Sequence, residues 1–533
     1  MANGAEAVFR QGAAALEAND FAAAERLFRS IVDADPRAHP AWNALSVVAV
    51  RAGLPDVAAA HAERALQLDR RNPVYLNNLG VALGELGRFE EAEQAFRRAL
   101  KARPVYAEGL FNLGKVLHKR ARLADSLRAY ERAYAIDARF PGLRESLANM
   151  YRKHGRADRA LTVLKEGPEG IEDGEMVPLT VQVLAEVEGV EAAIAWLEGL
   201  NARYPKWYNG RFSLAMLLLS RGRWREGWRH FTFRHNMLAD RVGPDGAPRN
   251  LPAPLPSRLD GVSLRLRGEQ GLGDILFFLR FTAELLARGA SASVVVPPKL
   301  APVLRGGERL EFLAGESDGL TWRAGSAQGA GAYDLPLGDL PAVLETEAAP
   351  PAFAPALDAA RVAACRERLA RLGPAPYLGL TWRAGTDVLR NQEFGRSRAF
   401  LSKELPLAEL GAAVRGWRGT LLALQRGPYQ GEIEAISGAA GAPVHDLSAL
   451  NDDLPEMLAA LAAIDEHVAV SNTNIHLLAG IGRTARVLVP YPPEWRWMRE
   501  GDSPWFPGFP VYREPQSRGW AEPLAKLRTD LIG

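Results

Sequence analysis

The apolar positions in the first third of the chain recur with a fixed spacing. The segment NNLGVALGELGRFEEAEQAF, which begins at residue 77, aligns with FNLGKVLHKRARLADSLRAY, which begins at residue 111, so that Leu79 lies over Leu113. The same step of 34 residues leads back to Leu45 and forward to Leu147, and Gln11 lies one further step before Leu45. This spacing predicts five similar units, each built from a pair of helices.

The expected turn between the two helices of each unit follows the same step. In the five units it is occupied by Asn19, Gly53, Gly87, Ala121 and Gly155. Most of these residue types tolerate the left-handed conformation that ends a helix. The second helices also carry matching pairs of residues four positions apart, which are Ala24/Phe28, Ala58/Ala62, Ala92/Phe96, Ser126/Tyr130 and Ala160/Leu164.

This 34-residue unit, with Leu-Gly in its first helix and Ala-x-x-x-aromatic in its second, resembles the tetratricopeptide repeat. Small residues are needed where the paired helices touch, and the large residues fill the gap to the next pair. Such repeats bury their cores only by stacking, and their curvature leaves a concave groove for a peptide or protein. We therefore expect residues 1–167 to form an α-solenoid that binds a protein partner, with a scaffold or dimerisation surface as the alternative.

From residue 168 to 240 the strict period fades. The stretch LLLSRGRWREGWRHFTFRH still predicts a helix-turn-helix with Gly222 in the turn. We interpret this region as degenerate helical repeats that cap the solenoid, with Trp224, Trp228 and Phe231 as packing residues. The stretch RVGPDGAPRNLPAPLPSRLDG, which is rich in Pro and Gly, then indicates a domain boundary.

After this boundary the pattern changes to short apolar runs that alternate with helical ones. SLRLRGEQ, SASVVVPP and YDLPLGDL are typical of strands in residues 241–365, and YLGLTWRAGT, GTLLALQRG and ARVLVPYPP are typical of strands in residues 366–533. The alternation predicts an α/β fold of two Rossmann-like halves, with ligands at the carboxyl ends of the strands.

Composition and charge narrow the class of protein. Hydrophobic residues make up 47% of the chain and charged residues 24%, which is typical of a folded globular protein. The 65 Lys and Arg nearly balance the 63 Asp and Glu, and the net charge of +2 gives no indication of nucleic acid as a partner. No apolar run reaches the length of about 18 residues that a membrane-spanning helix needs, so we expect a cytoplasmic protein. The single cysteine, Cys365, excludes an internal disulfide and is expected to be a buried small side chain.

A glycine-rich loop follows the first expected strand of the second half. In GEQGLGDILFF, Gly271 and Gly273 permit a close approach of the backbone, and Asp274 lies where the next helix begins. A carboxylate in this place either caps the helix or acts as a base on a hydroxyl bound in the cleft. A dinucleotide site would need a third glycine, as in G-x-G-x-x-G, and an acidic residue about 20 positions further on. Because the third glycine is absent, NAD binding is disfavoured.

A second candidate motif is VAVSNTNIHLLAGIGRTARVLVP. A strand ends near Ser471, the polar residues Asn472, Thr473 and Asn474 follow, and a helix begins with His476. Such a turn offers free N–H groups and the positive end of the helix dipole to a phosphate. For His476, contact with a ligand and a structural role are both open.

Taken together, GEQGLGDILFFLRF, GLTWRAG, LLALQRG, SNTNIHLLAGIGRTARVLVPYPPEWRWM and DSPWFP resemble the bacterial tetratricopeptide-repeat proteins that end in a glycosyltransferase domain related to family 9, the heptosyltransferase family. The resemblance covers nearly the whole chain, and it implies a GT-B fold for residues 241–533. Within that group, proteins of this layout include bacterial flagellin glycosyltransferases, in which the repeats hold the flagellin.

The resemblance also assigns roles to individual residues. Asp274 matches the family's candidate general base, and Lys403 in SKELPLAEL lies where heptosyltransferases place a lysine that contacts phosphate. The residues that match the turn facing the donor phosphates are Asn472, Thr473, Asn474 and His476. Heptosyltransferases usually have an aspartate and a glycine near this turn, and the present chain departs from that pattern.

Other residues are candidates because of where the expected strands end. Trp382, Arg383 and Gln425 lie at strand ends that face the same cleft, where they are in reach of the sugar or base of a donor. Trp495 and Trp497 belong to an aromatic loop that we expect to pack over the cleft. The sequence Asp-Ala-Asp at residues 33–35 imitates a metal-binding D-x-D motif, but it lies in the first repeat, so we attribute it to charge at a helix end. No metal or cofactor is expected.

The sequence thus leads to one hypothesis and two alternatives. The hypothesis is a metal-independent, inverting GT-B glycosyltransferase that moves a sugar from a nucleotide-sugar donor to Ser or Thr hydroxyls of a protein acceptor, with flagellin as the leading acceptor. The first alternative is a non-catalytic repeat adaptor with a degenerate GT-B domain. The second is a glycosyltransferase of lipopolysaccharide assembly that acts on a saccharide.

Overall fold

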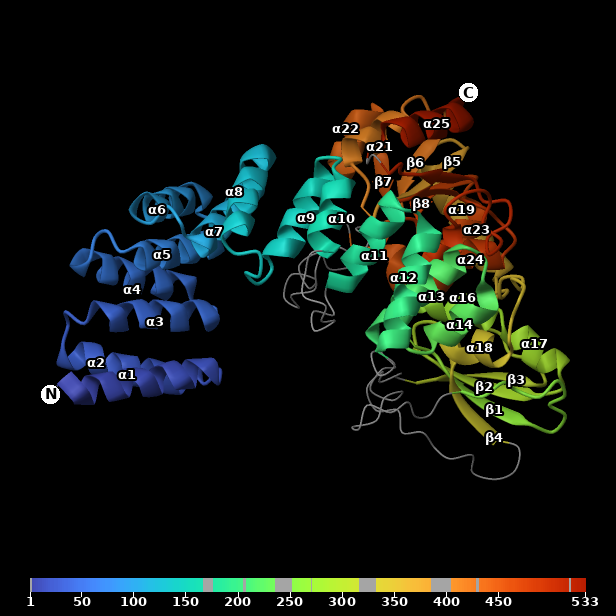
Figure 1. The fold of residues 1–533 in the computed structure, drawn as a ribbon. Coiled ribbons are helices and arrows are strands. Elements are labelled where there is room, and N and C mark those ends of the chain that lie inside the picture. The colour runs from blue at the N-terminus through green and yellow to red at the C-terminus, as the bar shows by residue number, and fades with distance from the viewer. Residues whose placement is uncertain are drawn as a thin grey trace. The chain divides into compact units, whose positions relative to one another are not determined.

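The chain divides into two compact units, Met1–Ile171 and Glu172–Gly533. The computed structural model describes residues 2–165, 176–204, 208–234, 252–269, 271–315, 332–384, 404–427, 431–516 and 519–533. The described part of the first unit is helical, and the second unit combines helices with two parallel sheets (Figure 1). The predicted succession of a helical repeat region and an α/β region is therefore confirmed.

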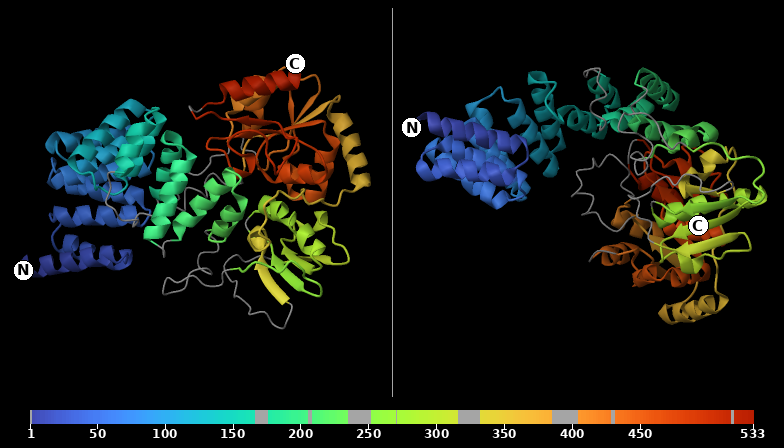
Figure 2. Two further views of the ribbon diagram at one scale, coloured as in Figure 1. Left: turned by 45° about the vertical axis from the view of Figure 1, so that its right-hand side comes forward. Right: turned by 90° about the horizontal axis from the view of Figure 1, so that it is seen from below.

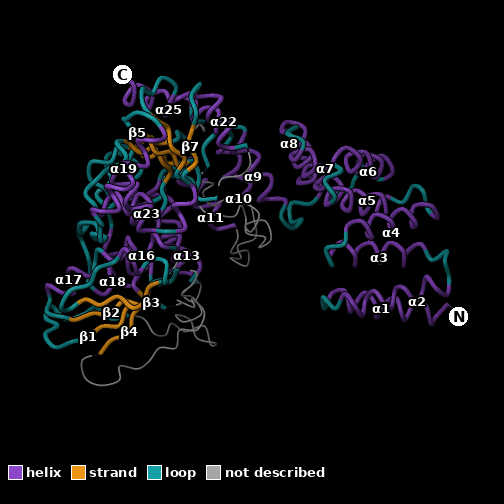
Figure 3. The backbone as a smooth tube through the Cα atoms, turned by 180° about the vertical axis from the view of Figure 1, so that it is seen from behind, coloured by secondary structure: helices purple, strands orange, loops and turns teal. Residues whose placement is uncertain are grey.

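The first unit is a row of five helix pairs (Figure 3). Its helices are α1 (Ala2–Glu17), α2 (Phe21–Ala34), α3 (His39–Arg51), α4 (Pro55–Leu68), α5 (Pro73–Glu85), α6 (Phe89–Ala102), α7 (Ala107–Lys119), α8 (Leu123–Ile136), α9 (Leu143–Lys153) and α10 (Ala157–Lys165). Local sequence sets several of the starts. The side chain of Asn72 accepts hydrogen bonds from the backbone at the start of α5, and Pro73 supplies the φ angle that a first helical residue needs.

The paired helices touch at glycines. A Cβ atom at Gly80 would lie 2.7 Å from Cε1 of Phe96, and a Cβ atom at Gly114 would lie 2.5 Å from Cε1 of Tyr130. Only a residue without a side chain leaves room for the aromatic ring of the second helix in these places. The structure therefore confirms that the Leu-Gly positions of the first helices require small residues.

The turns between the paired helices also agree with the sequence pattern. All five residues at the expected turn position have positive φ, with values of 59° at Asn19, 74° at Gly53 and Gly87, 57° at Ala121 and 68° at Gly155. Glycine adopts this conformation without strain, whereas in alanine the Cβ atom clashes with the backbone and raises the energy of the turn. Ala121 is thus the strained turn of the set.

The second unit begins with four helices, α11 (Met176–Val187), α12 (Val190–Arg203), α13 (Asn209–Ser220) and α14 (Trp224–Phe231). Gly222 has a φ of 74° in the turn between α13 and α14, which confirms the expected helix-turn-helix. The sequence led us to interpret these helices as degenerate repeats that cap the first unit, but they are part of the second unit. The reason is that Trp228 and Phe231 are buried against Phe278 of the α/β region, with ring centroids 6.2 and 5.6 Å from it.

The first sheet has four parallel strands in the order β3-β2-β1-β4. Its strands are β1 (Ser263–Arg267), β2 (Ser291–Val296), β3 (Leu310–Ala314) and β4 (Ala332–Pro336), and the helices nearby are α16 (Leu272–Leu279), α17 (Thr282–Ala287), α18 (Leu340–Val343), η2 (Ala301–Val303) and η3 (Leu337–Asp339). In β1 and β2 every second residue is buried, so that Leu264, Leu266 and Val294 face the core. This alternation explains why polar residues interrupt the apolar ones in SLRLR.

The second sheet has six parallel strands in the order β10-β9-β8-β5-β6-β7. Its strands are β5 (Tyr377–Thr381), β6 (Thr420–Ala423), β7 (Val444–Asp446), β8 (Glu466–Val470), β9 (Arg486–Val489) and β10 (Val511–Arg513). Orange and red helices flank the strands of this half in Figure 2. The helices of this half are α19 (Ala359–Leu372), α21 (Leu407–Val414), α22 (Glu432–Ala440), α23 (Leu454–Ala463), α24 (Thr473–Gly480) and α25 (Ala521–Ile532), with the short turns η4 (Ser448–Asp452) and η5 (Trp495–Trp497). Every residue of β5 and β6 is buried, as expected for parallel strands covered on both faces.

An aromatic loop after β9 packs the two halves of the second unit together. Trp495 and Trp497, which are 4% and 0% exposed, lie in this loop. The ring of Trp495 lies 5.3 Å from that of Phe277 on α16 and 5.2 Å from that of Trp228 on α14, measured between ring centroids. The expectation that this loop packs is therefore confirmed, and its tryptophans are core side chains.

Candidate functional site

The carboxyl ends of strands from both sheets line one cavity of about 280 Å³ in the second unit. Its walls come from residues that follow β1, β5, β6 and β8, together with Asn451 and Arg496. In the second sheet the chain runs from β5 outward to β6 and β7, and then returns on the other side of β5 with β8. Parallel sheets bind ligands at the carboxyl ends of the strands where such a reversal occurs. The topology therefore makes this cavity the candidate binding site.

The loop between β1 and α16 forms one wall. Gly271 is the residue before α16, and its extended backbone brings the first turn of the helix to the cavity. Asp274 lies in that first turn, but no side chain caps α16, so helix capping does not explain the aspartate. Its Oδ1 atom accepts a hydrogen bond of 2.6 Å from Nη2 of Arg496, and its side chain is 29% exposed. The carboxylate thus reaches both the cavity and a cation from the other half of the unit.

Arg496 holds the carboxylate from the aromatic loop. Its side chain is 10% exposed, it also pairs with Glu494, and its guanidinium lies 4.5 Å from the ring centroid of Phe277. Burial alone would lower the pKa of this guanidinium, but the charges of Glu494 and Asp274 outweigh that effect and raise the pKa. Arg496 is therefore a permanent cation that has two carboxylate partners, only one of which lines the cavity.

The turn between β8 and α24 forms the opposite wall. Asn472 caps α24, because its Oδ1 accepts a hydrogen bond of 3.3 Å from the backbone N–H of Ile475. Thr473 and Asn474 open the helix, so that its positive end faces the cavity. The predicted strand-to-helix turn is confirmed. His476 is 7% exposed and packs edge-on against Phe277, which makes it a wall residue with a structural contact.

Helices α16 and α24 approach each other at Gly273. A Cβ atom on this glycine would lie 3.1 Å from Cδ2 of His476 and 3.6 Å from Cα of Thr473. The expected close approach of the backbone is therefore confirmed, although its partner is another helix of the same unit. As a result, the amino ends of two helices from different halves meet at one cavity.

The ends of β5 and β6 supply the remaining predicted residues. Arg383 is 3% exposed, and its Nε atom lies 3.2 Å from a carboxylate oxygen of Glu432. Gln425 lines the cavity, but its Oε1 accepts hydrogen bonds from the backbone N–H groups of Trp382 and Arg383, at 3.1 and 3.0 Å. The side-chain amide of Gln425 thus fixes the shape of this wall.

One predicted residue does not line the cavity, and another lies outside the part of the chain that the structure describes. Trp382 is 1% exposed and packs in the apolar core of the second sheet with Leu380 and Leu405, so the expectation that its indole faces the cleft is corrected. The indole is a large apolar group, and it gains more by burial in this core than at a polar wall. Lys403 lies outside the described residues.

Arg426 lines the cavity, and sequence reasoning missed it. It is exposed, and within the described residues its guanidinium has no hydrogen-bonded or ion-paired partner. Arg496 was also missed, although it stood within the quoted aromatic run. The sequence did contain a signal for a buried ion pair at this residue. Arg496 lies between two tryptophans and two positions after Glu494.

The electrostatics of the cavity favour an anion. Two helix amino ends and Arg426 line it, together with Arg383 and Arg496, whose charges are shared with the carboxylates of Glu432, Glu494 and Asp274. Backbone N–H groups at helix starts and arginine side chains are the groups that bind phosphate. Among the described residues, no group of three His, Cys, Asp or Glu side chains could hold a metal ion.

The matching reversal in the first sheet, between β1 and β4, holds a buried ion triad. Arg234 follows α14 and is 1% exposed. Its Nη1 lies 2.7 Å from Asp339, which follows β4, and the same guanidinium pairs with Glu269, which follows β1. The two carboxylates outweigh desolvation and raise the pKa of Arg234. The segment that follows α14 thus fills this crevice with the side chain of Arg234.

Comparisons with known proteins bear on the first unit and on the chain as a whole. A family model described as tetratricopeptide repeat matches residues 9–73 and 77–142. Protein FlbA of Caulobacter vibrioides is 26% identical over 552 residues, which cover 97% of this chain and 88% of that protein. No helix among the described residues is long and apolar enough to cross a membrane.

Solved structures match a part of the chain. A structure of pilF from Pseudomonas aeruginosa is 23% identical, covers 39% of this chain and 95% of its own, and has a TM-score of 0.33. A structure of MamA is 25% identical, covers 29% of this chain and 90% of its own, and has a TM-score of 0.26. Similarities with TM-scores this low carry no argument. The repeats in residues 9–142 are thus tetratricopeptide repeats, and the whole chain is homologous to Protein FlbA.

Proposed function

We propose that the protein is a glycosyltransferase of the GT-B type, in which the cavity binds a nucleotide-sugar donor and the repeats hold a protein acceptor. The observation that carries the proposal is the composition of the cavity wall. It combines two helix amino ends and three arginines with one cavity-facing carboxylate, Asp274, at the carboxyl ends of two parallel sheets. Such a wall suits a phosphorylated donor and places a base beside it.

The donor phosphates would lie at the start of α24. Its free N–H groups and the unpaired guanidinium of Arg426 are the parts of the wall that are open to a new anion. Arg383 contributes charge from behind this position while it stays paired with Glu432. No metal ion takes part in the proposed reaction, because helix ends and arginines neutralise the leaving phosphate.

Asp274 would act as the general base. It removes the proton from the acceptor hydroxyl while the hydroxyl oxygen forms a bond to the anomeric carbon. The bond from that carbon to the phosphate oxygen breaks, and the nucleotide leaves with the electron pair, so that the configuration of the sugar inverts. The pair with Arg496 holds the carboxylate at the cavity, and Glu494 retains the arginine when Asp274 takes up the proton.

The acceptor would be a protein that the tetratricopeptide repeats capture, with transfer to Ser or Thr hydroxyls in the cytoplasm. A peptide held by the repeats has a raised effective concentration at a site on the same chain. The family resemblance implies flagellin as the acceptor. A saccharide acceptor would leave the repeats without a part in the reaction.

A non-catalytic adaptor is the second candidate, and one contact favours it. In the adaptor, the ion pair of Asp274 with Arg496 is a permanent bridge between the two halves of the second unit. The repeats would then bind a partner, and the cavity would at most sense a nucleotide. Replacement of Asp274 by Asn distinguishes the transferase from the adaptor. If the carboxylate is the base, this variant loses turnover but still binds the nucleotide.

Nucleotide binding tests the donor site directly. The melting temperature of the protein would be measured with UDP, GDP, CMP and ADP, each well above its plausible dissociation constant. At about 100 times that constant, a bound nucleotide adds about 2.7 kcal/mol to the free energy of unfolding. We expect one nucleotide to raise the melting temperature, and no shift with any of the four would count against the proposal.

Two arginines that flank β6 give a matched pair of variants. Arg426 follows this strand at the cavity, and Arg418 precedes it at the far end, and both are exposed. Arg426→Gln is expected to weaken the nucleotide-induced shift, whereas Arg418→Gln should leave the shift unchanged. Equal effects of the two substitutions would mean that the nucleotide binds elsewhere.

A further inference from the structure

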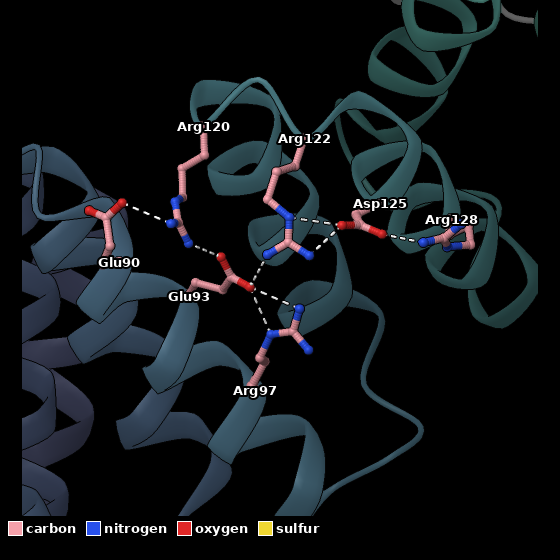
Figure 4. A network of polar contacts seen from close by, with 7 residues as sticks. All are labelled: Glu90, Glu93, Arg97, Arg120, Arg122, Asp125 and Arg128. Carbon is pink, nitrogen blue, oxygen red and sulfur yellow. Dashed lines mark hydrogen bonds and ion pairs between the residues drawn. The ribbon is translucent and has the colours of Figure 1, made fainter.

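The charge cluster of the repeats has a structural explanation. Figure 4 shows this network around Glu93 of α6, whose side chain is 7% exposed and is paired with three arginines. The residues of the network are Glu90, Glu93, Arg97, Arg120, Arg122, Asp125 and Arg128. All three of its carboxylates are paired, and the network joins α6 to the turn between α7 and α8. It therefore fixes one repeat on the next.

Another cluster of paired charges, in the second unit, lines a cavity of about 740 Å³. The walls of this cavity come from α14, α17, the segment before β1 and residues 344–350. Ser257 precedes β1 and Arg288 precedes β2, so part of the wall lies at the amino ends of these strands. None of the described residues lines both this cavity and the candidate site at the carboxyl ends. Its volume is typical of small-molecule sites, which range over about 300–1,000 Å³. We call it the second cavity.

The charged groups of the second cavity balance one another. They are Glu284, Glu345, Glu347, Arg225 and Arg288, together with Arg229, which pairs with Glu345 from the next turn of α14. Arg225 lies 3.3 Å from a carboxylate oxygen of Glu345 and 3.4 Å from one of Glu347. Because three positive charges meet three negative ones, the wall is complementary to neither a cation nor an anion. A ligand that fits this wall is neutral.

The wall offers open hydrogen-bond acceptors. Arg288 donates four hydrogen bonds, one to Glu284 and three to backbone carbonyl oxygens, so its guanidinium is largely occupied. In contrast, the Oε2 atoms of Glu284 and Glu347 have no hydrogen-bonded or ion-paired partner in the described part of the chain. These two side chains are 41% and 69% exposed, so both carboxylates are accessible. The wall thus suits a neutral ligand that donates hydrogen bonds, as hydroxyl groups do.

A buried hydroxyl in the same wall lacks a partner. Thr346 is 6% exposed, and its Oγ1 atom makes no hydrogen bond. An unsatisfied buried polar group costs about 1–3 kcal/mol, and native structures keep few of them. The preceding residue, Glu345, has a positive φ of 54°, which is uncommon for a residue other than glycine. Two unfavourable local features therefore lie side by side in the wall, and a ligand that bonds to Thr346 would relieve one of them.

Apolar groups complete the wall. Leu255 and Leu344 are 8% and 4% exposed, and they line the cavity together with Ala349 and Pro350. A small-molecule site commonly combines such apolar groups with a few polar ones that fix the orientation of the ligand. A sugar ring matches this combination, because it presents C–H groups on its faces and hydroxyl groups around its edge.

We propose that the second cavity binds a neutral saccharide. Its hydroxyl groups donate hydrogen bonds to the carboxylates of Glu284 and Glu347, and one of them pairs with the hydroxyl of Thr346. The C–H groups of the ring lie against Leu255 and Leu344. This inference goes beyond the proposed function, because it concerns a different cavity and needs neither a nucleotide nor a transfer step.

The test is saturation-transfer difference NMR of the full chain with maltose, cellobiose, lactose and N,N′-diacetylchitobiose, each at millimolar concentration. We expect a signal from at least one of them, and we expect that signal to persist when UDP, GDP, CMP and ADP are added. No signal from any of the four would overturn the proposal. Loss of the signal on addition of a nucleotide would also contradict it, because the saccharide would then lie in the donor cavity. The assay contains no nucleotide-sugar, so its outcome is independent of sugar transfer.

Two threonines that are equally buried give a matched pair of variants. Thr346→Val removes the hydroxyl without a partner, so it should weaken saccharide binding by roughly tenfold while the melting temperature does not fall. The control is Thr420→Val, because Thr420 is also 6% exposed, but its hydroxyl donates a hydrogen bond of 2.7 Å to the carbonyl oxygen of Pro374. This control should lower the melting temperature and leave saccharide binding unchanged. Unchanged binding in Thr346→Val would contradict the proposal.

A second pair of variants tests the carboxylates. Glu347→Ala is expected to weaken saccharide binding by roughly tenfold, because it removes an acceptor of the wall. Glu311→Ala removes an exposed carboxylate from β3, which does not line the second cavity, and should have no effect. Equal effects of the two substitutions would contradict the proposed position of the saccharide. Displacement of the saccharide by spermidine would contradict the proposed chemistry, because the carboxylates would then select a cation.

Discussion

Replacement of Arg234 by Met is expected to destabilise the second unit more than any exposed substitution in it. Met matches the volume of the arginine stem but removes its charge. The change leaves the carboxylates of Glu269 and Asp339, which are 9% and 0% exposed, without their common cation. Removal of one partner from a buried ion pair costs about 3–5 kcal/mol, because an uncompensated charge stays in the interior.

The cost should depend on pH in a defined direction. With Arg234 gone, the two carboxylates are buried without their common cation, and the cost of burying their negative charge is smaller at low pH, where a carboxyl group can take up a proton. The difference between the Arg234→Met variant and the parent is therefore expected to grow from pH 5 to pH 8.

The tryptophans give a probe of the second unit alone. Eleven of the twelve tryptophans lie beyond residue 171, so tryptophan emission during urea or thermal unfolding reports almost entirely on this unit. A loss of 3–5 kcal/mol corresponds to a fall of roughly 4–7 °C in melting temperature for a domain of this size. The control is Arg223→Met, which breaks an exposed pair with Glu226 and should cost less than about 1 kcal/mol. A loss for Arg234→Met no larger than that of the control would refute the reasoning.

Three further predictions concern single positions. Ala121→Gly should stabilise the repeats by about 1 kcal/mol, because it relieves the positive φ of 57°, and far-ultraviolet circular dichroism during unfolding would show it. Gly114→Ala should destabilise the repeats by about 1–2 kcal/mol, because the new Cβ atom would lie 2.5 Å from the ring of Tyr130. The control is Gly84→Ala, which should not destabilise them, because the atom nearest to its Cβ would lie 3.8 Å away. Burial lowers the pKa of His467 to about 3. The imidazole therefore stays neutral in the folded state, whereas in the unfolded chain it takes up a proton below pH 6.5. The free energy of unfolding consequently falls as pH falls. In His467→Gln the loss between pH 7 and pH 5 should be smaller by about 2 kcal/mol, and an unchanged loss would contradict the assignment.

The parts of the fold that the sequence predicted are those governed by local rules. The step of 34 residues gave the five helix pairs because each pair repeats the same contacts, and the turn position gave the left-handed residues because few residue types tolerate that conformation. The strand-loop-helix segments at Asp274 and Asn472 were predicted for a similar reason. In each of them, a short apolar run precedes a polar turn and an amphipathic helix.

The parts that the sequence did not predict depend on contacts between distant segments. Arg496 and Asp274 are 222 residues apart, and no local pattern indicates that they meet. Arg234 and Asp339 are 105 residues apart, and their pairing is what draws the helical connector into the second unit. The sequence analysis placed the side chain of Trp382 in the cleft, whereas it lies in the core. The residues at a strand end point to two sides of the sheet, and the sequence alone does not tell which side faces the cavity.

The role of Arg496 also bears on the proposed chemistry. The arginine is shared between Asp274 and Glu494, so that a proton transferred to Asp274 does not leave a buried cation unpaired. The ion pair also holds the carboxylate in one place, which suits the removal of a proton at the moment of transfer. The same arrangement explains how a carboxylate can be both a structural contact and a reactive group.

The central claim is that the second unit transfers a sugar with Asp274 as its base. It is tested most directly by incubation of the full chain with flagellin and a panel of nucleotide-sugars, followed by intact-mass spectrometry of the flagellin. The account predicts a mass increase of one or more sugar units with one donor, and no increase with the Asp274→Asn variant, although that variant still shows the nucleotide-induced rise in melting temperature. The account would be contradicted if no donor gave an adduct, or if Asp274→Asn transferred the sugar as fast as the parent.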